Sequence, residues 1–395
     1  MTVFVDQEKL ASAGQGLRLD VARSLAQVEA MADEWCALGQ RSSLRLGYFQ
    51  TFDWCANWLR HVALHLPGTE PYVIAVWQGD RLVAAVPLML TRISAGPRVL
   101  SALGDPHTQY AGMLLDPGAC ASSVAAMVRT YLAQPEGCDA LYMELLPSIS
   151  PLAAMLDPDW REAGYENQSS SLDLTQFETP GDFLEDADPK KRRKRLQRRQ
   201  KIEKEFGQLR LRTVWGGEPE FEALVHRCVA MKKDWIAGTG RISSGFSMPG
   251  YAEFLSQLKG DAATREGAVA FVKQVGDRII AIEVSMICNG HLYAYIGGFD
   301  WELRKLSPGK VQMEATVCWC IDNGIKAYDL LGNVASYKDS WTNISCELLA
   351  FSRAYTMTGW LYSTAWRSRM RPALKQLYQT LPAGLRQWAS SSLAS

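Results

Sequence analysis

The chain has 395 residues, of which 47% are hydrophobic and 21% are charged, and its 42 basic residues balance 42 acidic ones. This is the composition of an ordinary globular protein, and it excludes a disordered chain. The chain is longer than a domain with a single hydrophobic core usually is, so its length predicts two domains or a duplicated unit. A net charge of zero argues against polyanionic partners only if the charges are evenly spread along the chain.

The charges are in fact segregated. Ten basic residues and a single acid, Glu203, occupy the stretch Lys190–Lys204, which carries +9. No acid follows Glu347, and six basic residues give the C-terminal tail +6. Overall neutrality then leaves −15 on the remainder, so the chain is an acidic body with two basic elements.

Cysteine usage and hydropathy favour the cytoplasm. The nine cysteines are scattered and form no CxxC pair, as expected of reduced core thiols. The first twenty residues contain five charged side chains and no apolar core of a signal peptide. Uncharged runs such as Ala354–Trp366, with 13 residues, are shorter than the roughly 20 residues of a membrane-spanning helix. We expect a cytoplasmic protein, with peripheral contact at the inner membrane left open.

Two segments 197 residues apart resemble each other. Val73–Ala84 and Ala270–Ala281 are both apolar, β-branched runs interrupted by Gly-Asp, at Gly79 and Gly276. This pattern is typical of a tight β-hairpin. It predicts two copies of one unit of strands and helices, at about 20–175 and 205–350. The alternative is that two unrelated hairpins share a common turn.

Each half then predicts a helix followed by a short strand. In the first half these are 121–134 and 141–146, and in the second half 310–323 and 326–331. In the second half, the turns Gly276-Asp277 and Asn289-Gly290 also separate three predicted antiparallel strands. These strands are 269–275, 278–288 and 291–299, and a further strand at 347–355 completes the predicted mixed sheet of that half.

The loop before the second-half helix has the features of an anion site. Ser307, Pro308, Gly309 and Lys310 come directly before or at the start of that helix. The first amides of a helix have no internal partners and, with the helix dipole, attract phosphate. Gly309 allows close approach to the backbone and Lys310 adds a charge; a plain loop that only starts the helix is the alternative.

The order of these elements resembles the core of the GNAT acyltransferases, in which the equivalent loop holds the pyrophosphate of acyl-CoA. The sequence is most similar to the tandem-GNAT branch that includes the CelD-type acetyltransferases of bacterial polysaccharide gene clusters and the related Fem peptidyltransferases. The resembling residues are Gly298-Phe299-Asp300, Ser307-Pro308-Gly309, Asp329-Leu330-Leu331-Gly332, Tyr337-Lys338-Asp339-Ser340-Trp341, and in the first half Phe49-Gln50-Thr51, Trp54, Trp58, Pro87-Leu88, Gly104 and Tyr110.

The resemblance implies an α/β (α+β) fold with two GNAT-like mixed sheets flanked by helices, related by internal duplication. The first half has no Ser-Pro-Gly-Lys loop, so it would form the acceptor side and the second half the acyl-CoA side. The expected boundaries are 1–180 for the N-terminal domain, 181–207 for a basic linker helix, 208–352 for the C-terminal domain and 353–395 for a basic amphipathic tail.

Acyl transfer from a thioester to an amine needs a base, a polarised carbonyl and a proton for the leaving thiolate. In the resembling motifs, Asp329 is the expected base or positions one, and Tyr337 the expected proton donor. Glu283 interrupts an apolar strand and is a second candidate base, since a lone carboxylate is costly to bury. Each of these residues has a structural alternative. Asp329 could bond the turn that follows it, Tyr337 could be a half-buried ring with a satisfied hydroxyl group, and Glu283 could be a paired carboxylate.

Other candidates would bind substrate. Lys338 and Trp341 lie in the same motif, and His107 and Tyr110 lie in a first-half loop that would line the acceptor side. No cysteine or histidine spacing is typical of a metal site, so we expect no metal. Acetyl-CoA is the expected acyl donor.

The basic run predicts a helix from Pro189, with Asp188 as N-cap, to about Phe206. It is either a solvated linker or binds an anionic acceptor such as a lipid-linked sugar, and Arg195 and Arg199 are the candidate contacts. Their spacing also matches some cyclic-dinucleotide sites. Without interleaved aromatics, nucleic acid is not an expected partner.

The tail places Trp360 and Trp366 beside Arg367, Arg369 and Arg371, a pattern typical of an anionic membrane interface. Packing of the tail on the body is the alternative.

The sequence therefore predicts an acetyl-CoA-dependent N-acyltransferase that acts on an amino sugar or on a precursor of the cell envelope or an exopolysaccharide, by direct attack on the thioester. Two alternatives remain open. One is a non-catalytic, degenerate GNAT that regulates polysaccharide synthesis in response to nucleotide or membrane. The other is a Fem-type peptidyltransferase that uses aminoacyl-tRNA.

Overall fold

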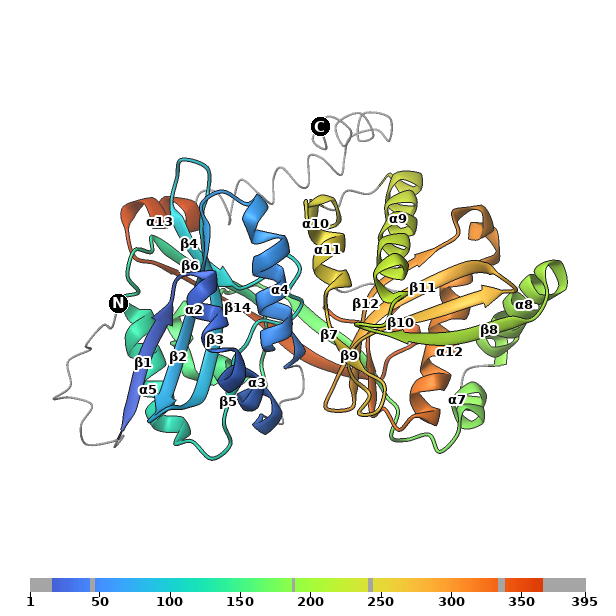
Figure 1. The fold of residues 1–395 in the computed structure, drawn as a ribbon, viewed down its shortest axis with the longest axis horizontal. Helices are drawn as coiled ribbons and strands as arrows, with labels where there is room; N and C mark the ends of the chain where they lie inside the picture. Colours follow the sequence, from blue (N-terminus) through green and yellow to red (C-terminus); the bar gives the residue numbers. More distant parts are fainter. Residues whose placement is uncertain (1–15, 43–46, 187–188, 241–243, 333–337, 365–395) are drawn as a thin grey trace. The chain divides into compact units, whose positions relative to one another are not determined.

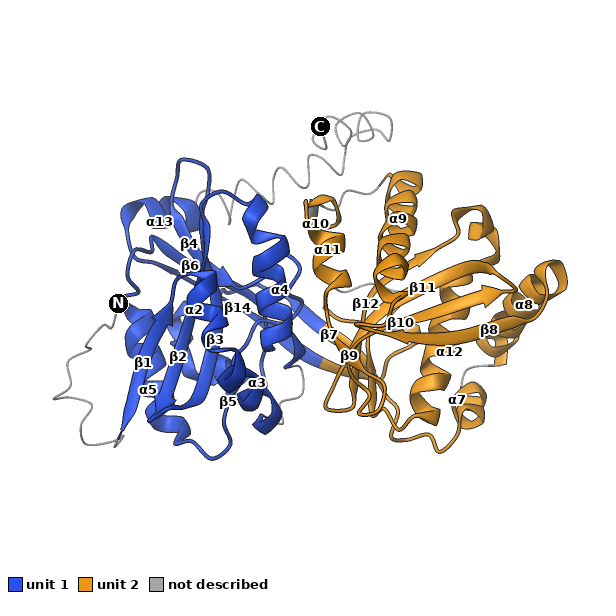
Figure 2. Ribbon diagram, viewed as in Figure 1, with its two compact units in different colours: residues 1–168, 346–393, 395 blue, residues 169–345, 394 orange. Residues whose placement is uncertain are grey.

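The chain forms two compact units, and the computed structural model describes residues 16–42, 47–186, 189–240, 244–332 and 338–364. Unit 1 consists of residues 1–168 and 346–393, and unit 2 of residues 169–345 (Figure 2). The tail residues from 365 onward and Tyr337 lie outside the described residues. No helix in the described ranges has the length and apolarity needed to cross a bilayer.

Unit 1 is built on a mixed sheet. In sheet order its strands are β1 (Leu17–Ala22), β2 (Thr69–Gln78), β3 (Arg81–Arg92), β4 (Arg98–Ala102), β6 (Ala140–Pro147) and β14 (Ile344–Ala354), and β5 (Leu114–Leu115) pairs with β3. All neighbours are antiparallel except β4 and β6, which are parallel.

The helices of unit 1 cover this sheet. They are α2 (Leu25–Glu29), α3 (Ala32–Arg41), α4 (Phe52–His61), α5 (Ala121–Ala133), α6 (Pro151–Met155) and α13 (Met357–Leu361), with 3-10 turns η1 (Tyr48–Gln50), η2 (Ala63–His65) and η3 (Pro158–Trp160). The predicted helix 121–134 and strand 141–146 are thus present as α5 and β6. α5 buries Val124, Val128 and Leu132 in the same core as β2 and β3.

Unit 2 repeats the plan. In sheet order its strands are β7 (Asn167–Asp173), β13 (Ala327–Asp329), β12 (His291–Phe299), β11 (Arg278–Cys288), β10 (Glu266–Val275) and β8 (Leu209–Trp215), and β9 (Gly260–Asp261) pairs with β10. Its helices are α7 (Pro180–Asp186), α8 (Pro189–Phe206), α9 (Phe221–Thr239), α10 (Ser244–Ser247), α11 (Tyr251–Ser256) and α12 (Pro308–Asp322), with 3-10 turns η4 (Trp301–Leu306) and η5 (Lys338–Ser340).

The two faces of the unit 2 sheet carry different helices. Figure 1 shows α9 and α11 on one face and α12 and α7 on the other. The thiol of Cys228 on α9 approaches the carbonyl oxygen of Ile282 on β11 at 3.5 Å. On the opposite face, Val317 and Cys320 of α12 pack with Phe271 of β10. α8 lies beside α12, where its Ile202 is fully buried.

The internal duplication extends to the details of the hairpins. The β2–β3 hairpin pairs Gln78 with Arg81, and the β10–β11 hairpin pairs Val275 with Arg278, 197 residues later. The register shifts between Val76 and Trp77 in the first hairpin, and between Lys273 and Gln274, again 197 residues later, in the second. In both units a helix then connects antiparallel strands to one parallel strand. Two GNAT-like mixed sheets flanked by helices, related by duplication, are therefore present.

The last strand of each unit differs from the sequence expectation. The predicted strand 347–355 is present as β14, and it pairs with β6 of unit 1. Conversely, β7 follows the first half of the chain and pairs with β13 of unit 2. Each unit is thus completed by a strand from the other half of the sequence, and the boundary lies near residue 168, not 180.

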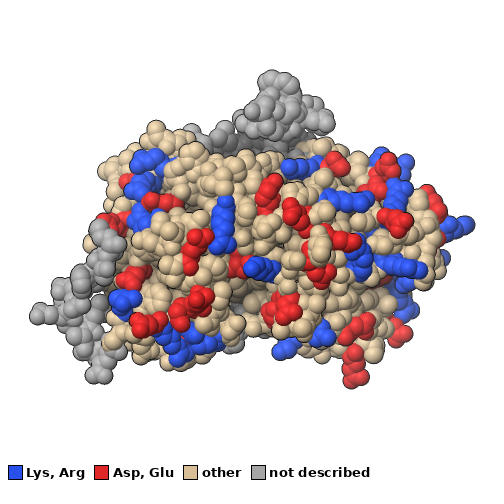
Figure 3. Space-filling view, in the orientation of Figure 1, with Lys and Arg blue, Asp and Glu red and all other residues tan. Residues whose placement is uncertain are grey.

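The basic helix is part of unit 2, not a linker between the domains. Its sparse apolar residues suffice to anchor it, because Ile202 and Phe206 pack with Leu209, Ile280 and Val311. Most of its basic side chains are exposed, as its thin apolar stripe predicts. On the face shown in Figure 3, basic and acidic side chains are interspersed over both units.

Candidate functional site

The parallel strands β12 and β13 pair over only part of their length. His291–Tyr293 pair with Ala327–Asp329, and β12 then continues to Phe299. Among the described strands, none pairs with this edge of β12 beyond Tyr293. The backbone groups of that edge are therefore available to an extended ligand that enters between the diverging strands. We call this place the β12–β13 gap.

The N-terminus of α12 follows β12 through η4. Ser307 adopts a left-handed conformation (φ 55°, ψ 52°), and its side chain makes no capping hydrogen bond to the helix. Pro308 is the first helical residue, and Gly309 and Lys310 follow. Ser307, Gly309 and Lys310, which the sequence predicted as the cofactor-binding residues, thus meet at the uncapped start of a 15-residue helix. Such an end attracts anions through its amides and its dipole.

The motif Gly298-Phe299-Asp300 fixes the path into this helix. A Cβ on Gly298 would lie 2.5 Å from the carbonyl oxygen of Cys228, so only glycine lets α9 pack this closely on β12. The side chain of Asp300 accepts a hydrogen bond from the amide of Glu302 at 3.0 Å, and it pairs with Arg278 at 2.5 Å. The motif is therefore explained by packing and capping, which position α12 behind β12.

A buried polar cluster lies where the two strands diverge. Asp329 is fully buried; its Oδ1 accepts a hydrogen bond from the amide of Leu331 at 2.6 Å, and its Oδ2 lies 3.1 Å from Nε2 of His291. The ammonium of Lys338 donates hydrogen bonds to the carbonyl oxygens of Leu331 and Gly332 at 3.0 and 2.6 Å. Burial lowers the pKa of Lys338, an effect that the negative charge of Asp329 opposes. Lys338 thus holds the turn after β13, and its contact with a phosphate stays a prediction.

His291 is a member of this cluster that was not predicted from the sequence. It is buried, and it is the first residue after the Asn289-Gly290 turn, on the strand parallel to that of Asp329. The signal was present: the predicted order of elements makes 291–299 and 326–331 adjacent parallel strands, which places a histidine and an aspartate near the same end.

Glu283 belongs to a separate cluster. It is buried on β11, and its two carboxylate oxygens accept hydrogen bonds from the hydroxyls of Ser285 and Tyr328, both at 3.0 Å. Burial raises its pKa to about 7, although both hydrogen bonds act in the opposite direction. Tyr328 and Asp329 are consecutive on β13 and therefore point to opposite faces of the sheet. The structure thus separates the two predicted bases: Glu283 faces α12, and Asp329 faces the other side.

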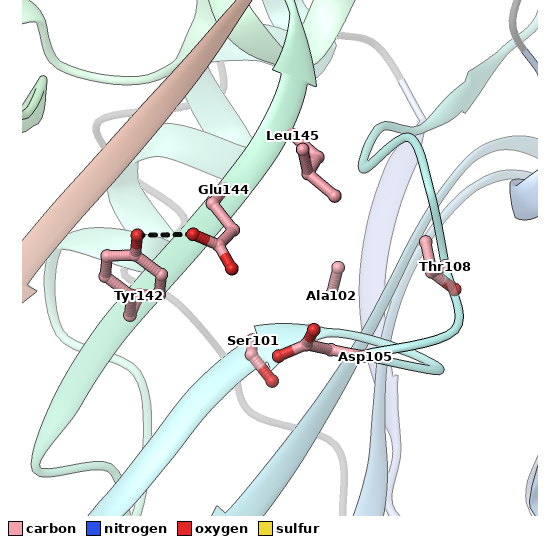
Figure 4. A pocket seen from close by; sticks show the side chains of 7 residues that line it. All are labelled: Ser101, Ala102, Asp105, Thr108, Tyr142, Glu144 and Leu145. Carbon is pink, nitrogen blue, oxygen red and sulfur yellow. Dashed lines mark hydrogen bonds between the residues drawn. The ribbon is translucent and has the colours of Figure 1, made fainter. Parts of the chain in front are cut away.

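Unit 1 has a smaller version of the gap. β4 and β6 pair only at Val99–Leu100 with Ala140–Leu141. Beyond them lies a pocket of about 10 Å³, the space of one water molecule. Figure 4 shows the carboxylates of Glu144, from β6, and Asp105, from the loop after β4, on either side of it, with Glu144 bonded to the hydroxyl of Tyr142 at 2.8 Å.

His107 and Tyr110 do not line this pocket, although Asp105 and Thr108 of the same loop do. His107 is buried and accepts a hydrogen bond from the indole of Trp58 at 2.9 Å, while Tyr110 is fully buried against Phe49. The loop is held in place by these core contacts. As described, both residues are turned into the core of unit 1.

Arg195 and Trp341, both predicted to bind substrate, come together in unit 2. The guanidinium of Arg195 lies 3.8 Å from the ring centroid of Trp341, and both line a cavity of about 190 Å³. Arg199 is not among the residues that line this cavity; it is exposed and pairs with Glu203 at 3.2 Å. Arg195 and Arg199, whose spacing matches some cyclic-dinucleotide sites, therefore do not line the same cavity.

Comparisons with known proteins agree with this geometry. Residues 190–339 match a family model described as the acetyltransferase (GNAT) domain, which covers the β12–β13 gap and α12. No curated protein sequence matches the chain.

Among solved structures, the fold is similar to that of FemX, with a TM-score of 0.59 and 10% identity over 84% of this chain and 97% of that one. It is also similar to the C-terminal domain of a putative lysylphosphatidylglycerol synthetase from Agrobacterium fabrum, with a TM-score of 0.53 and 13% identity over 87% and 96% of the two chains. A third similar structure is a conserved protein of unknown function from Bacteroides thetaiotaomicron, with a TM-score of 0.50 and 10% identity over 84% of this chain and 99% of that one.

At such identities the structural matches show the fold, and the family model shows the kind of domain in unit 2. Together with the duplicated strand order, they show two GNAT-like units in tandem, of which the second matches the acetyltransferase (GNAT) domain, in a chain whose fold is similar to that of FemX.

Proposed function

We propose that the protein transfers an acetyl group from acetyl-CoA to the amino group of an acceptor molecule, in unit 2. The observation that carries the proposal is the β12–β13 gap, which leads directly to the uncapped N-terminus of α12. An acyl-CoA donor has an extended pantetheine arm, which can pair with a strand edge, and a diphosphate, which suits a helix N-terminus. The β12–β13 gap would therefore accept the pantetheine arm, and the N-terminus of α12 would accept the diphosphate.

The chemistry then follows from the residues around the gap. With the thioester carbonyl at the point of divergence, backbone amides of β12 would polarise it. The acceptor amine attacks the carbonyl carbon, the new C–N bond forms, and the C–S bond breaks. The Asp329–His291 pair takes the proton that the amine loses, and Tyr337 is the proposed donor of the proton that the thiolate gains.

The acceptor is the least constrained part of the proposal. We propose an amino sugar or an amine-bearing precursor of the cell envelope or an exopolysaccharide, because of the resemblance to CelD-type acetyltransferases noted in the sequence. The likeness to the FemX fold supports a second candidate, transfer of an aminoacyl group from tRNA. Both candidates place the same reaction, attack of an amine on an activated carbonyl, in unit 2.

A donor-exchange assay separates the candidates. The purified full chain is incubated with a panel of amino sugars and either acetyl-CoA or a mixture of aminoacyl-tRNAs, and products are detected by mass spectrometry. A gain of one acetyl group together with release of free CoA thiol supports the proposal. If product forms only with aminoacyl-tRNA, the Fem-type reaction would replace acetyl transfer as the proposed function. If neither acetyl-CoA nor aminoacyl-tRNA is consumed with any acceptor, the regulatory alternative would be favoured.

Peripheral contact with an anionic membrane is also a proposal. α13 exposes Met357, Trp360 and Leu361, which are 72%, 52% and 51% accessible. They lie in the acid-free C-terminal segment that carries +6. Exposed apolar and aromatic side chains in a basic segment are typical of helices that lie at a membrane interface.

A further inference from the structure

The cavity that Arg195 and Trp341 share is a distinct feature of unit 2. It has a volume of about 190 Å³, and its walls come from α7, α8, β7 and the segment Ser340–Asn343. Aromatic rings of Phe177, Phe183 and Trp341 form part of the lining, and Lys191 adds a second basic side chain. None of the residues that line it belongs to β12 or to the start of α12.

Arg195 packs against two aromatic rings in this cavity. Its guanidinium lies 3.8 Å from the ring centroid of Trp341 and 5.5 Å from that of Phe183. Its side chain is only 10% exposed, although the helix around it is largely solvated. An arginine stacked on an aromatic ring loses little further freedom when it binds, and the edge of its planar fork stays available to an oxyanion.

The hydrogen-bonding capacity of Arg195 is incompletely used. Its Nη1 is buried and has no hydrogen-bond acceptor among the described residues. The nearest carboxylate, Glu314, lies 3.8 Å from Nε, beyond hydrogen-bonding distance. A buried guanidinium N–H without an acceptor is costly, so a site that retains one is suited to a ligand that supplies an oxygen.

The local charge is also positive. Lys273 on β10 is 8% exposed and, like Arg195 and Arg199, interacts electrostatically with the single carboxylate of Glu314. Burial raises the pKa of Glu314, and this further weakens it as a counter-ion. Glu203, which pairs with Arg199, and Asp186, which lines the cavity, are the other acids nearby. With Lys191 at the cavity, four basic groups face three acids, of which Glu314 is partly desolvated, and this leaves a net positive charge on this side of unit 2.

We propose that this cavity binds a small molecule bearing a phosphate group, with the Arg195 fork on the phosphate oxygens and Lys191 at the rim. The amide side chain of Asn343, which also lines the cavity, donates a further hydrogen bond. The site is separate from the donor gap, because Leu172 in its wall pairs with Tyr328 and so lies on the α12 face, whereas Asp329 lies on the other face. The proposal does not depend on the acyl-transfer reaction.

The test is titration of the full chain with inorganic phosphate, and then with glucosamine 6-phosphate, by isothermal calorimetry in a phosphate-free buffer at 150 mM salt. Arg195→Gln removes the fork and should raise Kd at least tenfold, while Arg195→Lys should give an intermediate loss. The matched control, Arg193→Gln, removes the same charge from an exposed position on α8 and should stay within twofold. Equal affinity of Arg195→Gln and the wild type, or equal losses in both Gln variants, would overturn the proposal.

Two further arms make the result decisive. Asn343→Asp keeps the acceptor for the amide of Asp173 (2.9 Å) but places a negative charge in the wall, so it should weaken phosphate binding even if Arg195→Gln does not fold. CoA carries phosphates of its own, so the phosphate titration is repeated with saturating CoA. Unchanged phosphate affinity is expected, and competition would assign the cavity to the donor and overturn the claim of a separate site.

Discussion

Glu283 makes the stability of unit 2 depend on pH in a defined direction. Its carboxyl group is buried, and burial raises its pKa from 4.5 in the unfolded chain to about 7. Between these values the folded protein retains a proton that the unfolded chain has released. Stability from this group is therefore fully present below pH 4.5, and it is lost as the pH rises through 7.

The size of the effect follows from the shift. Moving from 4.5 to about 7 corresponds to about 3 kcal/mol of unfolding free energy, at roughly 1.4 kcal/mol for each pH unit. A glutamine at this position does not titrate. Glu283→Gln should therefore lose this component of the pH dependence, even though its amide cannot accept the hydrogen bonds from Ser285 and Tyr328 in the same way as a carboxylate.

The assay is urea unfolding at pH 5.5 and pH 8.5, with hydrogen exchange of β11 peptides to report on unit 2. The wild type should lose about 2 kcal/mol more than Glu283→Gln between these two conditions, since part of the transition lies below pH 5.5. Glu222→Gln, at an exposed position on α9, is the control and should keep the wild-type slope. The reasoning is refuted if Glu283→Gln and the wild type have the same pH slope.

Three further predictions concern the gap, the packing and the membrane. Asp329→Asn should lower kcat about 10²- to 10⁴-fold while the Kd for acetyl-CoA stays within threefold, since it impairs proton transfer and not donor binding; a change confined to KM would contradict this. Gly298→Ala should lower the free energy of unfolding in urea by about 2–3 kcal/mol, because its Cβ would lie 2.5 Å from the carbonyl oxygen of Cys228. The control Gly297→Ala has open space around its Cβ and should lower it by less than about 1 kcal/mol. Equal losses in the two variants would contradict the packing argument. Met357→Ser with Trp360→Ser should weaken co-sedimentation with phosphatidylglycerol vesicles severalfold, with phosphatidylcholine vesicles as the neutral control, and unchanged binding would remove α13 from the interface.

Local signals predicted most of unit 2. Gly276-Asp277 and Asn289-Gly290 turn the chain where the pattern requires, so β10, β11 and β12 have nearly the predicted bounds. α12 begins at Pro308 and ends at Asp322, close to the expected 310–323. Turn chemistry and helix punctuation act over a few residues, which is why sequence reasoning locates them well.

Long-range pairing could not be predicted in the same way. Residues 344–354 suit a strand in either sheet, and nothing in those residues says that β14 pairs with β6 of unit 1. The separation of Glu283 from Asp329 had a similar cause, because it depends on contacts across strands: Glu283 accepts a hydrogen bond from Tyr328, whereas Asp329 lies beside His291. The stacking of Arg195 on Trp341 joins side chains that are far apart in sequence, so a run of basic residues could not distinguish the one buried arginine from its exposed neighbours.

The central claim, that unit 2 holds acyl-CoA at the start of α12, is tested most directly by the affinity for acetyl-CoA of three proteins. A Cβ at Gly309 would lie 3.6 Å from the ring of Phe299, an ordinary contact, so both Gly309→Ala and Gly309→Glu should fold. A glutamate in the first turn is favourable for the helix but repels a diphosphate. By isothermal calorimetry, Gly309→Ala should stay within about threefold of the wild-type Kd and Gly309→Glu should raise it at least tenfold. Equal binding of acetyl-CoA by Gly309→Glu and Gly309→Ala, or no binding by the wild type, would contradict the account.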